Sequence, residues 1–212
     1  MDRDKSTTHS RGGEMPAEGA ERPLEGAGGE FSTARSETDE RSAFTERAAR
    51  LGAELTSTLN DIEMRDVVAQ YGDEGATLLG HLLTTTPPGA SLRRLAVLAL
   101  EDLGPRAVGA LPAIIETAGN PKEKADTRRY ANGVLRELGS AAQEAVPTLI
   151  ETAQERGNDF MVRLTAIGAL SAVGSELPAV SSALRALARA PGEEPEIREA
   201  AARASGGSRR PS

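Results

Sequence analysis

Two glutamates, Glu116 and Glu151, occupy matching positions in two nearly identical segments, Leu111–Gly119 ("LPAIIETAG") and Val146–Gln154 ("VPTLIETAQ"). Two carboxylates about 6.5–9.5 Å apart form the acid–base pair of inverting glycosidases. Side chains on stacked helices, whose axes lie roughly 8–10 Å apart, fall near the wide end of that range. The surrounding sequence supplies no aromatic platform for a sugar and no sign of a closed cleft. The pattern therefore favours a solvated helix face over a catalytic pair.

The same face offers groups that suit a binding surface better than a reaction. A threonine directly follows each glutamate, so carboxylates and hydroxyls stand together at both positions. Stacked repeats hold their partners on extended surfaces of this kind. We therefore expect a partner to be bound by Glu116, Thr117, Glu151 and Thr152.

Other reactive groups are scarce in the 212 residues. There is no cysteine, so disulfides, thiolate nucleophiles and cysteine-bound zinc are excluded. The two histidines are His9, in a polar N-terminal stretch, and His81, among leucines, and neither is followed by glutamate. The phosphate-binding GxxxxGK[ST] and GxGxxG patterns and the GxSxG nucleophile pattern are missing. We expect no catalytic, cofactor or metal site.

The glutamates belong to an internal repeat with a period of 35 residues. The same step relates Arg93, Arg128, Arg163 and Arg198, as well as Ala96, Ala131, Ala166 and Ala201, and it relates Gly104, Gly139 and Gly174. Apolar residues recur at helical spacing within each unit, whereas no stretch alternates with period two. Each unit is predicted to be two helices, the first ending at the glycine and the second led by Pro112 or Pro147. Such pairs must stack to bury their apolar faces.

The segments "LRRLAVLALEDLG", "TRRYANGVLRELG" and "VRLTAIGALSAVG" resemble the HEAT-like repeat, especially the short form of the phycobilisome-lyase group. The resemblance covers residues 92–204 well and residues 44–83 loosely. It implies an all-α, right-handed α-solenoid of about four to five helix pairs. It also implies that the arginine at this position bonds to acidic or carbonyl groups of a neighbouring turn. Asp159 and Glu194, four residues before Arg163 and Arg198, are the expected acids.

The tails differ in composition from the repeats. Residues 1–37 contain hardly any large apolar side chain and are predicted to be a disordered N-terminal arm. Residues 38–204 form the predicted HEAT-like α-solenoid, and residues 205–212 form a flexible C-terminal tail. The N-terminus has no apolar signal segment, and we expect a cytoplasmic protein.

The expected function is a non-enzymatic scaffold or adaptor that binds a protein or peptide on the solenoid surface. The resemblance leaves open a bilin-lyase-type enzyme or accessory chaperone. A HEAT-like nucleic-acid binder is a further alternative, which could use the arginine ladder or the C-terminal arginines. The formal net charge of −7 disfavours it, because binding to a phosphate backbone needs clustered positive charge.

Overall fold

The computed structural model describes residues 28–57 and 61–206, and this part of the chain is helical with no β-strand. Contacts divide the chain into two units, residues 1–40 and residues 41–212. Of the first unit, the structure describes residues 28–40, which form the beginning of helix α1 (Gly28–Ser57). The second unit contains the rest of α1 and all the helices that follow.

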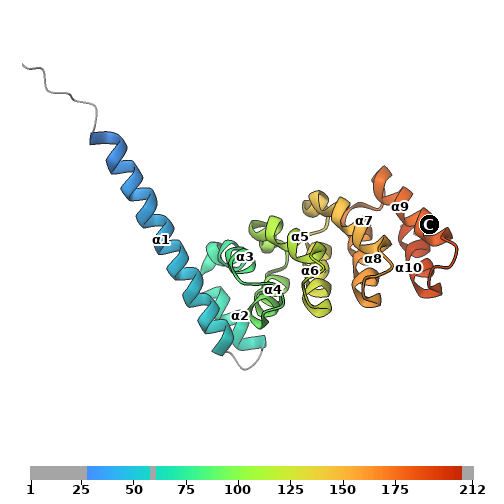
Figure 1. Cartoon of the computed structure of the whole chain (residues 1–212), viewed down its shortest axis with the longest axis horizontal. Coiled ribbons are helices and arrows are strands. Elements are labelled where there is room, and N and C mark those ends of the chain that lie inside the picture. Colours follow the sequence, from blue (N-terminus) through green and yellow to red (C-terminus); the bar gives the residue numbers. More distant parts are fainter. Residues whose placement is uncertain (1–27, 58–60, 207–212) are drawn as a thin grey trace, which may run out of the picture. The chain divides into compact units, whose positions relative to one another are not determined.

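The second unit is a succession of short helices (Figure 1). They are α2 (Asp61–Ala69), η1 (Gly72–Glu74), α3 (Gly75–Thr85), α4 (Ser91–Leu103), η2 (Gly104–Ala110), α5 (Leu111–Gly119), α6 (Ala125–Leu138), η3 (Gly139–Ala145), α7 (Val146–Gln154), α8 (Phe160–Gly174), α9 (Pro178–Arg189) and α10 (Pro195–Ser205). Those labelled η are 3-10 helices. We call α4, α6, α8 and α10 the arginine helices, and α5, α7 and α9 the proline helices.

The helices pack in two layers, as expected for stacked repeats. In one layer α4 contacts α6, α6 contacts α8, and α8 contacts α10; in the other, α3, α5, α7 and α9 contact one another in that order. The layers also pack on each other: α4 packs on α3, α6 on α5, α8 on α7 and α10 on α9. The second unit is therefore an all-α solenoid, and its core lies between the two layers.

Repeated small and branched residues fill that core. The four alanines of the repeat, Ala96, Ala131, Ala166 and Ala201, are all fully buried, and Leu100, Leu135 and Leu170 are at most 1% exposed. Alanine lets neighbouring helices approach closely, and the larger leucine side chains fill the core. Because each helix pair leaves an apolar face for the next pair, the core is continuous along the stack.

Glycine and proline set the helix ends largely as predicted. Gly104 and Gly139 have φ values of 54° and end α4 and α6, because glycine adopts this left-handed region without a side-chain clash. Pro112 and Pro147 lie in the first turns of α5 and α7, where a missing N–H leaves no bond unmade. The third unit differs, since α8 extends through Gly174 and no 3-10 helix follows it directly. The 3-10 helices η2 and η3 were not predicted.

The predicted N-terminal arm and C-terminal tail lie mostly outside the described residues. The structure describes residues 28–37 of the expected arm, and there α1 already begins at Gly28. Of the expected tail, it describes Ser205 and Gly206. The disordered arm and the flexible tail remain predictions. Across 28–57 and 61–206, no helix has both the length and the apolar character needed to cross a membrane.

Candidate functional site

Three of the four ladder arginines are buried between consecutive repeats. Arg93 and Arg163 are 2% exposed and Arg128 is 6% exposed, whereas Arg198 in α10 is exposed. A guanidinium removed from water must find hydrogen-bond acceptors, because an unpaired buried charge is strongly destabilising. The contacts of these three side chains therefore show what the ladder does.

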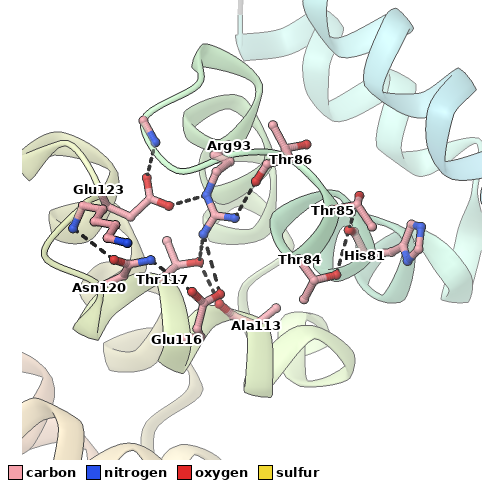
Figure 2. A network of polar contacts seen from close by, with 12 residues as sticks. His81, Thr84, Thr85, Thr86, Arg93, Ala113, Glu116, Thr117, Asn120 and Glu123 are labelled. Atoms are coloured by element: carbon pink, nitrogen blue, oxygen red, sulfur yellow. Dashed lines mark hydrogen bonds and ion pairs between the residues drawn. The ribbon is translucent and has the colours of Figure 1, made fainter.

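Arg93 lies at the centre of a network that joins the loop before α4, helix α5 and the loop before α6 (Figure 2). Its Nη1 donates to the carbonyl oxygen of Thr86 at 3.0 Å, and its Nη2 donates to the hydroxyl of Thr117 at 3.2 Å. The guanidinium also forms a buried ion pair with Glu123, and its Nη2 lies 3.7 Å from Oε2 of Glu116. Glu123 accepts a further bond from the backbone N–H of Gly89 at 3.0 Å.

Arg163 makes the most complete pairing of the three. Its Nε donates to the carbonyl oxygen of Ala153 at 3.0 Å, while Nη1 and Nη2 lie 2.9 Å and 2.8 Å from the two oxygens of Glu193. The hydrogen bond from Arg163 holds the pKa of the Glu193 carboxyl below its ordinary value. Both side chains are 2% exposed, so this is a buried, two-pronged ion pair.

Arg128 has a neutral partner where the other two have a carboxylate. Its Nε donates to the carbonyl oxygen of Ala118 at 2.9 Å, and its Nη1 donates to Oδ1 of Asn158 at 2.8 Å. No carboxylate among the described residues lies within ion-pair distance of this guanidinium. Burial consequently lowers the pKa of Arg128, and the carboxylate of Asp159 offsets this only in part.

The acceptors form a second ladder that sequence reasoning missed. Glu123, Asn158 and Glu193 are 35 residues apart, and each lies 30 residues after the arginine that it contacts. The expected pairing of Arg163 with Asp159 is wrong. Asp159 instead caps α8 by accepting bonds from the backbone N–H groups of Met161 and Val162 at 2.9 Å and 3.2 Å. The ladder thus joins each repeat to the next one.

The four expected partner-binding residues divide into two kinds. Glu116 and Glu151 are exposed at equivalent positions of the proline helices α5 and α7. Thr117 and Thr152 are only 0% and 2% exposed, so their side chains are not accessible to a partner, and this part of the prediction is corrected. The Thr117 hydroxyl donates to the carbonyl oxygen of Ala113 at 2.7 Å and accepts from Arg93.

A small pocket of about 140 Å³ lies beside this surface. Its floor includes Arg128 and Asn158, and Glu151 and Glu155 are exposed at its rim. It is also lined by Gly119, Pro121 and Thr152. The pocket therefore combines one buried cation with two solvent-facing carboxylates, at the end of the proline helices where the loops begin.

The histidines and the other carboxylates of the described residues do not form a comparable site. His81 packs edge-on against Phe44, with ring centroids 5.3 Å apart, beside an apolar pocket of about 280 Å³; His9 lies outside the described residues. In the described ranges, no group of three or more histidine and carboxylate side chains could hold a metal ion. Burial raises the pKa of Glu101, whose Oε1 lies against Gly133 on the arginine-helix layer.

Comparison with known families agrees with this architecture. Residues 122–206 match a family model described as HEAT repeats, and the match includes the second and third arginines of the ladder with their acceptors. No curated protein matched the sequence. The expected kinship with the phycobilisome-lyase group remains a prediction. The repeated helix pairs and the alanine and arginine ladders agree with this match, so residues 122–206 are similar to HEAT repeats.

Proposed function

We propose that this chain is a non-enzymatic adaptor that binds a protein or peptide on the loop-side edge of the solenoid, around Glu116 and Glu151. HEAT repeats commonly serve as scaffolds for protein interactions, and this general role is the starting point. One observation carries the proposal further: equivalent positions on successive proline helices present exposed carboxylates in the same register. Two like charges at repeat spacing suit a basic, extended partner segment.

The arginine ladder supports this function indirectly. Arg93, Arg128 and Arg163 are buried and donate to groups of the protein itself, so they hold the repeats together and do not offer a phosphate-binding strip. This weighs against nucleic acid as the main partner, since such binding depends on accessible cations. No observation favours the bilin-lyase alternative.

The proposal is tested by charge reversal at the two glutamates. The full chain is immobilised, proteins are captured from a lysate of the source organism, and the Kd of each captured protein is then measured. Glu116→Lys with Glu151→Lys is compared with Glu144→Lys and Glu196→Lys, two exposed acids away from this edge. We expect the first pair of changes to abolish binding and the second pair to leave the Kd unchanged. If the wild-type chain and both double variants bind the captured protein with the same Kd, the proposed binding surface is wrong.

A further inference from the structure

Arg128, the second arginine of the ladder, has a neutral hydrogen-bond partner, whereas Arg93 and Arg163 each have a carboxylate. Glu123 and Glu193 supply a carboxylate to Arg93 and Arg163, but the equivalent Asn158 supplies an amide oxygen to Arg128. The amide cannot simply turn, because its Nδ2 donates to the carbonyl oxygen of Thr152 at 3.0 Å while Oδ1 accepts from Arg128. Arg128 is only 6% exposed and has no carboxylate among the described residues within ion-pair distance.

The guanidinium of Arg128 is not sealed into the core. Arg128 lines the pocket of about 140 Å³, and its Nη2 makes no hydrogen bond to the described residues. The Nη2 groups of Arg93 and Arg163, in contrast, contact Thr117 and Glu193. A guanidinium in a partly dehydrated site binds a carboxylate through short, charge-assisted hydrogen bonds. The cavity of about 140 Å³ has room for one such group with its adjoining carbon atoms.

The rim indicates what should surround that carboxylate. Glu151 and Glu155 are exposed and line the same pocket, and Glu155 accepts a bond from the backbone N–H of Gly157 at 2.9 Å, which fixes its place in the turn. A free anion would be repelled by these two carboxylates. An acidic side chain flanked by basic residues would instead pair its carboxylate with Arg128 and its basic neighbours with Glu151 and Glu155.

We propose that the pocket at Arg128, Asn158, Glu151 and Glu155 binds the carboxylate of an aspartate or glutamate in a partner segment, with basic residues on either side of that acid. The partner's carboxylate takes the position relative to Arg128 that Glu123 and Glu193 take in the neighbouring rungs. This carboxylate-binding pocket is a more specific form of the proposed adaptor function. It rests on that function, because the carboxylate belongs to the partner protein.

The proposal is tested by measuring ligand binding at Arg128 in the full chain. Three probes are titrated while the Nε–H resonance of Arg128 is recorded by NMR: acetyl-Lys-Asp-Lys-amide, acetyl-Lys-Asn-Lys-amide and sodium acetate. Asn158→Glu is the matched variant, because it copies Glu123 and Glu193 and supplies the carboxylate from within. It is expected to raise the melting temperature while closing the site, so loss of binding cannot be ascribed to unfolding.

We expect the aspartate peptide to shift the Arg128 resonance with a Kd on the order of millimolar, roughly three- to tenfold tighter than acetate because of the rim carboxylates. The asparagine peptide and the Asn158→Glu variant should show no saturable response. No response of the wild-type protein to the aspartate peptide, or an equal response of the variant, overturns the proposal. If acetate binds as tightly as the aspartate peptide, the flanking basic residues contribute nothing, and the proposal that the carboxylate comes from such a partner segment is overturned. Because no partner protein is present, the titration is independent of the charge-reversal test of the adaptor function.

Discussion

Removing the carboxylate of Glu193 should strongly destabilise the solenoid, because this carboxylate is buried against Arg163. Glu193 and Arg163 are each 2% exposed and joined at 2.9 Å and 2.8 Å, and Glu193 also accepts from the backbone N–H of Glu194 at 3.0 Å. Loss of one partner from a buried ion pair costs about 3–5 kcal/mol, because the other charge is left uncompensated. Glu193→Gln keeps one acceptor oxygen, so we expect about 3 kcal/mol.

The assay is unfolding of the full chain in urea and by heat, followed by far-UV circular dichroism. For a domain of this size, about 3 kcal/mol corresponds to a fall in melting temperature of roughly 6–12 °C. Glu194→Gln is the control, since it removes the same charge from the next, exposed residue. If the two variants unfold at the same urea concentration, the buried ladder does not stabilise the stack and the reasoning is refuted.

Four other predictions concern the same core. Because the hydrogen bond from Arg163 lowers the pKa of Glu193 from its ordinary 4.5, this pair stabilises the protein above pH 4.5 and loses its effect as the pH falls through the lowered pKa. The difference in melting temperature between wild type and Glu193→Gln should therefore be full above pH 4.5 and shrink in acid below it. Burial raises the pKa of Glu101, so its contribution weakens as the pH rises, and Glu101→Gln should melt higher than wild type at neutral pH but not in acid. Gly139→Ala forces alanine to a φ of 54° and should cost about 1–2 kcal/mol in urea unfolding; an unchanged midpoint would contradict the strain. Gly168→Ala, inside α8 with open space around the new Cβ, should instead gain roughly 0.5–1 kcal/mol, and destabilisation would show that the position is crowded.

The repeat architecture could be predicted because its signals are local and recur. Alanine and leucine at helical spacing, a glycine at the end and a proline in the first turn all act within one helix, and they were found at Ala131, Leu135, Gly139 and Pro147. The arginine acceptors could not be found in the same way. Glu193 lies 30 residues after Arg163 and in the following repeat, so spacing within one helix pointed to Asp159 instead.

The candidate site was predicted only in part for a similar reason. Glu116 and Thr117 are adjacent in sequence, but successive residues of an α-helix point about 100° apart. The glutamate can therefore face solvent while the threonine turns inward to Ala113 and Arg93. The pocket beside Arg128 was missed because it depends on a difference between rungs, Asn158 in place of glutamate, and not on the repeated pattern.

The adaptor function that we propose requires the exposed carboxylates of successive proline helices to bind a partner protein. It is tested most directly by the Kd of a captured partner for the wild-type chain and for the Glu116→Lys, Glu151→Lys double variant, both confirmed to melt at the same temperature. We predict that the double variant loses measurable binding, while the Glu144→Lys, Glu196→Lys control keeps the wild-type Kd. Unchanged affinity of the double variant would contradict the account.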